Sequence, residues 1–222
     1  MLEVYHYPLC PFSRKLRIVL KEKFIGFELF YEPYWERRKE FLRMNPSGNT
    51  PVILKDGKLI IAGNQPLFEY IEEIYGDNSL LGNTPEERLV IRRIVEWFDV
   101  KFYNEVTNYI LNEKIIKTVS KSGAPNSQAI QAAKKNILYH LDYISFLRGD
   151  NRYIAGDKPT LADFTAAAQL SVLDFVGDVP WHHNQNTKDW YALVKSRPSF
   201  KPLLLDKIPN FHPPANYANP DF

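Results

Sequence analysis

The spacing of hydrophobic residues predicts strands and helices in alternation along the N-terminal part of the chain. Short runs of β-branched and aromatic residues, bounded by turn residues, predict four strands. These runs cover residues 4–7, 27–31, 52–54 and 59–61. Helical spacing predicts a helix directly after Cys10, with Leu16, Val19, Leu20 and Phe24 on its inner face, and two more helices over residues 36–44 and 66–75. Asp56-Gly57, between the last two strands, predicts a tight hairpin. The resulting order, βαβαββα, is that of a thioredoxin-like α/β domain.

The rest of the chain has the spacing of long helices. Thr84-Pro85-Glu86-Glu87 predicts a capping box at the start of a helix that reaches about Ile116. Further helices are predicted over residues 127–148, 161–175 and 187–195. The third of these four helices is rich in alanine and apolar residues, and Thr160 and Asp163 form a capping-box pattern at its start, so we expect it to lie at the centre of an all-helical domain.

The last 25 residues, 198–222, contain six prolines and interspersed aromatic residues. Proline at this density does not propagate a helix or a central strand. One interpretation is an extended strap that lies on the body with its aromatic rings in surface grooves. The other is a peptide that a partner captures, with Tyr217, Asp221 and Phe222 as the recognised side chains.

Length, charge and cysteine content narrow the classes of function. The 222 residues allow a thioredoxin-like domain over 1–78, a helical domain over 84–205 and a Pro-rich tail over 206–222. A net charge of +2 does not suggest nucleic acid as the main partner. One cysteine, no signal peptide and no apolar run of membrane-spanning length favour a cytoplasmic protein. The adjacent His182 and His183 have poor spacing for joint metal ligation, so we predict no metal site.

Cys10 is the candidate nucleophile. It follows a predicted strand and precedes Pro11 at the start of a helix, where unpaired N–H groups and aligned dipoles favour a thiolate. A thiolate at this place could form a mixed disulfide with a thiol substrate. Ser13 could instead donate a hydrogen bond to a bound thiolate. In the structural alternative, Cys10 is only a small residue that fills a helix start.

The predicted layout resembles the glutathione transferase superfamily over residues 1 to about 205. The segments that carry the resemblance are Cys10-Pro11-Phe12 with Arg17, Asn45-Pro46-Ser47-Gly48, Thr50-Pro51-Val52 and Leu161-Ala162-Asp163. The resemblance implies a thioredoxin-like N-terminal domain followed by an all-α domain, with a cis peptide bond before Pro51. It also implies a glutathione site beside Thr50 and Pro51.

One departure from that family bears on the activity. The resemblance implies that the γ-glutamyl carboxylate of glutathione binds at the start of the third helix, on an acidic residue followed by serine. We match that place to Gln65 and Pro66. Pro66 offers neither an N–H nor a hydroxyl, and the loss of two hydrogen bonds to a charged group weakens binding by roughly a hundredfold or more. The sequence therefore predicts weak glutathione binding at best.

A narrower resemblance covers both domains and the tail. The chain is similar to the FtsZ-binding, transferase-fold cell-division factors of alphaproteobacteria. The segments include Tyr34-Trp35-Glu36, Trp97-Phe98-Asp99, Gly177-Asp178-Val179-Pro180-Trp181 and the tail from Tyr217 to Phe222. This resemblance implies a homodimer that binds FtsZ filaments and links them to cell-wall synthesis through its C-terminal end, without glutathione chemistry.

Our leading interpretation is thus a non-catalytic adaptor without a cofactor, placed at the division site. Trp35 and the tail residues Tyr217, Asp221 and Phe222 are its candidate partner contacts. The alternative is a glutathione S-transferase or glutathione-dependent thiol reductase that uses Cys10, with glutathione as its cofactor.

Overall fold

The computed structural model describes residues 1–219 of the chain. Its N-terminal part contains a four-stranded mixed sheet with strand order β2-β1-β3-β4. β1 (Leu2–His6) is parallel to β2 (Phe27–Tyr31) and antiparallel to β3 (Val52–Lys55), which pairs with β4 (Leu59–Ala62). This sheet and its connecting helices confirm the predicted thioredoxin-like arrangement.

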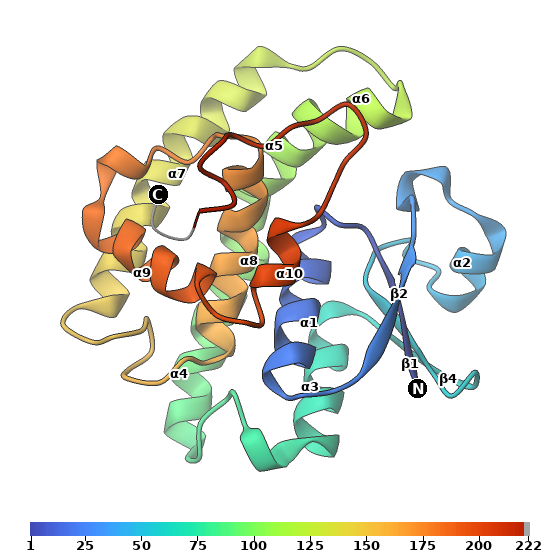
Figure 1. Cartoon of the computed structure of the whole chain (residues 1–222), viewed down its shortest axis with the longest axis horizontal. Helices are drawn as coiled ribbons and strands as arrows, with labels where there is room; N and C mark the ends of the chain where they lie inside the picture. Colours follow the sequence, from blue (N-terminus) through green and yellow to red (C-terminus); the bar gives the residue numbers. More distant parts are fainter. Residues whose placement is uncertain (220–222) are drawn as a thin grey trace.

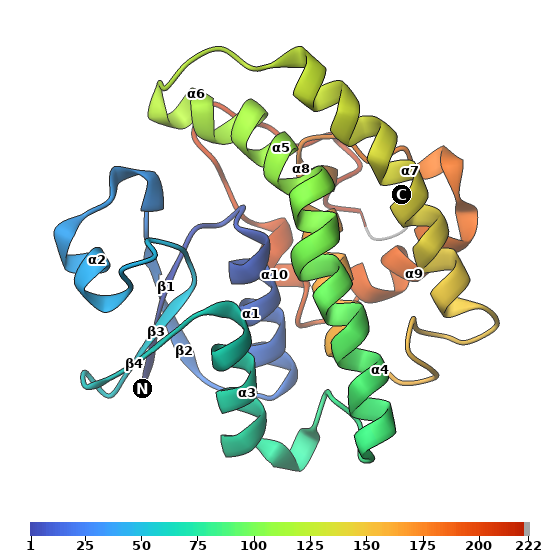
Figure 2. The same ribbon diagram turned by 180° about the vertical axis from the view of Figure 1, so that it is seen from behind.

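Helices lie on both sides of the sheet. α1 (Pro11–Glu22) and α3 (Asn64–Ile74) lie on the side that faces the helical domain, and α2 (Lys39–Met44) lies on the other, as Figures 1 and 2 show. The hairpin between β3 and β4 turns through Asp56 and Gly57, both at positive φ, as the sequence predicts.

The helical domain begins with one long rod and continues with α7 beside it (Figure 2). The capping box of Thr84 and Glu87 is present at the start of the rod. In chain order the rod consists of α4 (Pro85–Glu96), the π-helical stretch η3 (Trp97–Thr107), α5 (Asn108–Leu111), the π-helical stretch η4 (Asn112–Ile116) and α6 (Lys117–Ser120). The remaining helices are α7 (Ser127–Arg148), α8 (Leu161–Phe175), α9 (Gln185–Lys195) and α10 (Lys201–Leu204). Short 3₁₀ turns are η1 (Tyr34–Glu36), η2 (Gly76–Asn78) and η5 (Trp181–His183).

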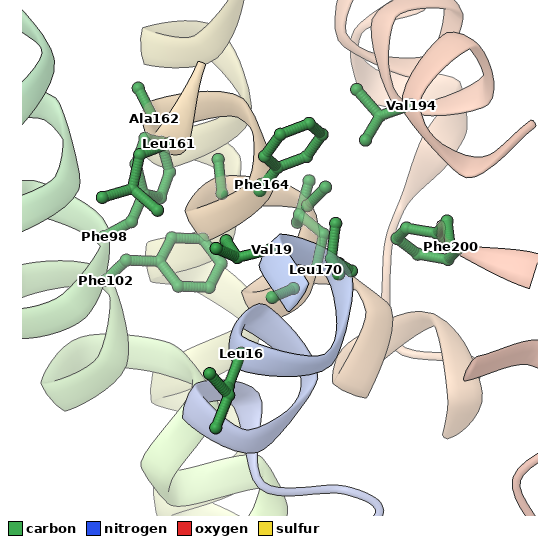
Figure 3. Packing of buried hydrophobic residues seen from close by; sticks show 14 of the residues in the cluster. Leu16, Val19, Phe98, Phe102, Leu161, Ala162, Phe164, Leu170, Val194 and Phe200 are labelled. Atoms are coloured by element: carbon green, nitrogen blue, oxygen red, sulfur yellow. The ribbon is translucent and has the colours of Figure 1, made fainter. Parts of the chain in front are cut away.

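The interdomain core, a cluster of buried apolar side chains, lies between α1, the long rod and α8. Every residue of α8 is buried, and the predicted capping box of Thr160 and Asp163 starts this helix. Figure 3 shows Leu16 and Val19 of α1 among Phe102 and Phe164 from the helical domain. The prediction that this helix occupies the centre is confirmed, because its apolar side chains meet neighbours on all sides.

Three sequence predictions about the fold are wrong in detail. Phe24 is 93% exposed, because α1 ends at Glu22 and Phe24 lies in a left-handed turn beyond it, with φ of 56°. Ile74, predicted to face inward, is 53% exposed at the end of α3. The proline-rich region also contains the short helix α10, where Pro202 lies in the first turn and its missing N–H costs no hydrogen bond.

A strap, residues 206–219, follows α10. In Figure 1 this red segment runs from α10 toward α6 and turns back across the end of α8. Ile208 and Tyr217 are buried, and Ile208 and Phe211 form an isolated bridge. Among residues 1–219, no helix is long and apolar enough to cross a membrane.

Candidate functional site

The turn between β1 and α1 places Cys10 at the start of the helix. Cys10 is the N-cap residue of α1 and Pro11 is the first helical residue, as predicted. The Cys10 N–H donates to the Tyr7 carbonyl at 3.0 Å, and its thiol donates to the Thr50 carbonyl at 3.3 Å. The Thr50–Pro51 peptide bond is cis, in agreement with the resemblance. The turn is thus closed against the loop before β3, and Cys10 is only 6% exposed.

A cavity of about 410 Å³ opens beside this turn, between the two domains. Its walls include Cys10, Tyr34 and Pro51 from the N-terminal domain and Asp99 and Tyr103 from η3. A larger hollow of about 920 Å³ is lined in part by residues of the interdomain linker, and Cys10 is not among its lining residues. We therefore take the smaller cavity as the candidate site.

Asp99 provides the carboxylate of this cavity. One of its oxygens, Oδ2, accepts from Lys15 Nζ at 2.5 Å and from Asn64 Nδ2 at 2.7 Å. The other oxygen, Oδ1, has no hydrogen-bond partner within residues 1–219. Burial lowers the pKa of Lys15, and the ion pair with Asp99 opposes that shift. The pair therefore neutralises itself, and the described residues that line the cavity include no free cation.

The cavity lining is neutral and rich in amides. It includes Asn49, Asn64 and Asn104, and neither lysine nor arginine occurs among the described residues that line it. Burial, helped by the nearby Cys10, raises the pKa of Tyr103 to about 12, so its phenol is neutral at physiological pH. Because Lys15 already pairs with Asp99, an anionic ligand would find no free cationic side chain among the described residues that line the cavity.

Thr50 and Pro51 line the cavity beside Cys10, where they were predicted. Ser13 does not line the cavity, because it is fully buried within α1, and its hydroxyl has no partner within residues 1–219. The structure thus brings Cys10, Thr50 and Pro51 together and places Ser13 away from any ligand in the cavity.

The predicted position of the third-helix site is wrong by two residues. Gln65 and Pro66 are exposed and do not line the cavity, whereas Gly63 and Asn64 do. α3 starts at Asn64, after Gly63 with φ of 91°, so Pro66 is the third helical residue. The absence of an N–H at Pro66 therefore does not bear on ligand binding in the cavity, and we expect weak glutathione binding because the described lining residues include no lysine or arginine.

Trp35 lies in an aromatic group on the outer side of the Cys10 turn, together with Tyr7, Tyr31 and Tyr34. The Trp35 ring packs edge-on against Tyr7, with centroids 4.9 Å apart, and against Tyr34 at 5.4 Å. Tyr7 is fully buried and Trp35 is half-buried, so part of the Trp35 ring faces solvent. Burial raises the pKa of Tyr34, so its hydroxyl stays neutral. Trp35 belongs to η1, directly before residue 36, where the second helix was predicted to start.

The predicted tail contacts have different outcomes. Tyr217 is 1% exposed, and its hydroxyl accepts from Arg14 Nη1 at 3.0 Å and donates to the Leu203 carbonyl at 3.3 Å. It cannot contact a partner in this conformation, so the strap interpretation is correct for Tyr217. Asp221 and Phe222 lie outside the described residues.

Sequence reasoning missed the buried cations of α1. Arg14 and Lys15 are almost completely buried next to the Cys10 turn, and their carboxylate partners are Asp206 and Asp99. Nothing in the local sequence shows whether basic residues near the start of a helix are buried in ion pairs or exposed to solvent. Within residues 1–219, no cluster of three His, Cys, Asp or Glu side chains could hold a metal ion.

Comparison with known proteins identifies the family. Residues 4–79 match the model of the glutathione S-transferase N-terminal domain. The chain is 42% identical to FtsZ-localized protein A of Caulobacter vibrioides over 222 residues, which cover 99% of this chain and 97% of that protein. The chain belongs to the family of FtsZ-localized protein A, within the glutathione S-transferase superfamily.

Solved structures of similar fold include both a glutathione S-transferase and FzlA. A glutathione S-transferase from Rhodospirillum rubrum F11 has a TM-score of 0.97 and 46% identity, with both chains fully covered. The structure of FzlA from C. crescentus has a TM-score of 0.95 and 42% identity, covering 100% of this chain and 99% of that one. The fold class is thereby confirmed, but two differently named relatives share it, so function has to be argued from surfaces and the cavity.

Proposed function

We propose that this protein is a non-catalytic adaptor that binds FtsZ filaments in the cytoplasm at the division site and couples them to cell-wall synthesis. The observation that supports this most strongly is the likeness to FtsZ-localized protein A over 99% of the chain, strap included. The lack of a lysine or arginine among the described lining residues agrees with an adaptor function, because an adaptor does not need to bind an anionic tripeptide.

The proposed filament contact is the Trp35 aromatic group. Its outer rings, Trp35 and Tyr31, are held by the buried ring of Tyr7 behind them. Rigid aromatic side chains with a packed base lose little entropy on binding, and such residues dominate interface energies. Charged side chains at Glu36, Arg37 and Lys39 are exposed next to this group and provide a polar rim.

The direct test is co-sedimentation of the purified protein with FtsZ. We expect the protein to pellet with assembled polymer and to stay in solution with unassembled FtsZ at the same concentration. A protein that remains in the supernatant at saturating polymer would refute the adaptor function.

The proposed link to cell-wall synthesis is the C-terminal end, with Asp221 and Phe222 as its handles. Because Tyr217 is buried, the truncation that tests this link must end at Asn219 and keep the strap. We expect that truncated chain to pellet with FtsZ polymer as the full chain does, but to lose capture of division cell-wall synthesis proteins. Unchanged capture would remove the C-terminal end from the proposal.

We also propose a homodimer. A row of rings, formed by Tyr139, Trp97, Tyr143 and Phe146, runs along the outer face of η3 and α7, and Phe146 is 78% exposed. A second copy would remove these rings from water. Light scattering should report a dimer for the natural chain and a monomer for Phe146→Glu, with Phe24→Glu as the exposed control. A monomeric natural chain would contradict the dimer.

The alternative function is a glutathione S-transferase or thiol reductase. The observation in its favour is that Cys10 lines a cavity beside the cis Thr50–Pro51 bond. Retention on immobilised glutathione that is lost in Cys10→Ala would support it. We expect no retention, because the described residues that line the cavity include no lysine or arginine that could bind the carboxylates of glutathione.

A further inference from the structure

Arg14 is the most completely enclosed charge beside the Cys10 turn. It lies on α1 with no exposed surface, and its hydrogen-bond contacts join it to four other residues. Its Nε donates to the Pro8 carbonyl at 2.7 Å, two residues before Cys10. Its Nη1 donates to the carbonyl and hydroxyl of Ser171 on α8, at 3.2 and 3.0 Å. One guanidinium thus ties the turn to the central helix.

The remaining partners of Arg14 belong to the strap. Nη1 donates to the Tyr217 hydroxyl at 3.0 Å, and Nη2 pairs with Asp206 Oδ2 at 3.3 Å. Asp206 also receives two hydrogen bonds from Arg17, at 2.8 and 2.9 Å. The strap therefore provides the only carboxylate within salt-bridge distance of Arg14 among the described residues.

The strap is seated closely over the end of α8. Gly177, with φ of 73°, follows α8, and a Cβ there would lie 3.0 Å from Cγ of Pro214. The Tyr217 ring meets Phe175 edge-on at 5.4 Å. These contacts hold the strap at Pro214 and at the buried Tyr217.

A second path runs from the strap to Trp35 through apolar packing. Tyr217, Cys10 and Tyr7 belong to one buried group, the turn cluster, which also contains Phe175, Ile208 and Leu111. Trp35 packs against this cluster from outside, edge-on to Tyr7. Tyr7 in turn accepts the Cys10 N–H, so the ring that supports Trp35 belongs to the same turn that Arg14 holds.

We propose that the strap, the Cys10 turn and the Trp35 aromatic group form one coupled unit, in which undocking of the strap frees the turn and loosens the Trp35 surface. Undocking removes both Asp206 and Tyr217 from Arg14. A buried cation without its counter-ion is unstable, so Arg14 must move toward water and release the Pro8 carbonyl. The Trp35 group then loses its fixed base.

The coupling is reciprocal, because two sites that bias one two-state element affect each other equally. A partner that holds the strap away from the body would weaken binding at Trp35, and a partner that rigidifies Trp35 would strengthen docking of the strap. This consequence rests on the function proposed above, whereas the coupling itself is a property of the isolated chain.

The single cysteine allows a direct test on the purified protein. The rate at which Ellman's reagent modifies the buried Cys10 thiol reports opening of the turn. We expect Tyr217→Ala to react roughly tenfold faster than the natural chain or more, and Tyr217→Phe, which keeps the ring but loses the acceptor, to lie between them. Asn216→Ala, an exposed neighbour in the strap, should react at the natural rate.

Hydrogen exchange distinguishes local from global opening and tests the reverse direction. In Tyr217→Phe, amides of residues 6–12 should exchange faster while those of α8 stay protected. In Trp35→Ala, the N–H groups of Phe211 and Tyr217, which donate within the strap, should exchange faster. Equal thiol rates in Tyr217→Phe, Asn216→Ala and the natural chain, with unchanged strap exchange in Trp35→Ala, would overturn the coupling whether or not the protein binds FtsZ.

Discussion

The interdomain core and the turn cluster differ in what they bury. The interdomain core packs α1 against the long rod and α8 with apolar side chains such as Leu16, Phe102 and Phe164. The turn cluster is smaller, lies against the Arg14 guanidinium, and includes the Tyr7 hydroxyl, which has no partner within residues 1–219. The core therefore provides stability that depends little on pH. The packing of the turn cluster depends on nearby charges, which a conformational change or a proton can disturb.

The comparison also shows where function can change. The candidate surfaces, Trp35 and the cavity at Cys10, both adjoin the turn cluster, whose packing includes strap residues. The interdomain core keeps the two domains packed together, whereas the packing of the turn cluster can change when its charged contacts change.

The largest effect should come from the interdomain core. Phe164→Ala removes a fully buried ring from α8 and should lower the free energy of unfolding by about 3–5 kcal/mol. Urea unfolding followed by circular dichroism measures the loss. Phe24→Ala, at an exposed position, is the control and should change stability by no more than about 0.5 kcal/mol. A similar loss in both variants would contradict the assignment of the core.

Asp206→Ala should have the next largest effect, because it leaves Arg14 and Arg17 buried without their carboxylate. We expect a loss of about 3 kcal/mol in urea unfolding. Asp150→Ala, at an exposed carboxylate, is the matched control and should behave as the natural chain. If the two variants unfold alike, the ion pairs of the strap do not stabilise the protein.

Acid should lower the free energy of unfolding through His6, which is buried at the end of β1. Burial, followed by the charge of Arg17, lowers the pKa of His6 to about 4, with Asp206 opposing and Arg14 adding to the shift. In the unfolded chain His6 therefore binds a proton near pH 6.5, whereas in the folded chain it stays neutral down to about pH 4. The free energy of unfolding falls as the pH drops through that range. Between pH 7 and pH 5 we expect a loss of roughly 2 kcal/mol from this group. The same decline in His6→Asn would show that His6 is not responsible.

The smallest effect should come from Pro66→Ser. Because Pro66 is exposed and does not line the cavity, the added hydroxyl and N–H should leave both urea stability and glutathione binding unchanged, within about 0.5 kcal/mol. Calorimetric titration with glutathione checks the binding. Glutathione binding that appears only in this variant would show that residue 66 belongs to the glutathione site.

Much of the fold was predictable because its determinants are local. The capping boxes at Thr84 and Thr160, the Asp56-Gly57 hairpin and the apolar α8 can each be recognised within a few residues. The candidate site was predictable only in part. Cys10, Thr50 and Pro51 line the cavity, but the third helix was predicted to start at Pro66, two residues after its actual start at Asn64, and Gly63 and Asn64 line the cavity in place of Gln65 and Pro66.

The missed features all join distant parts of the chain. Lys15 meets Asp99, and Arg14 meets Asp206 and Tyr217, across 84, 192 and 203 residues. Spacing within one helix cannot show which of its cations will find a carboxylate on another element. The buried Tyr217 was equally invisible, since an aromatic residue between prolines suits both a docked strap and a captured peptide.

Co-sedimentation of two matched variants tests most directly whether the Trp35 aromatic group is the proposed contact with FtsZ filaments. Trp35→Ala removes the half-buried ring at one end of α1, and Phe24→Ala removes an exposed ring beyond the other end. We expect Trp35→Ala to bind polymer about thirtyfold more weakly, as loss of an interface anchor does, while Phe24→Ala binds as the natural chain. Equal binding by Trp35→Ala and the natural chain would contradict it.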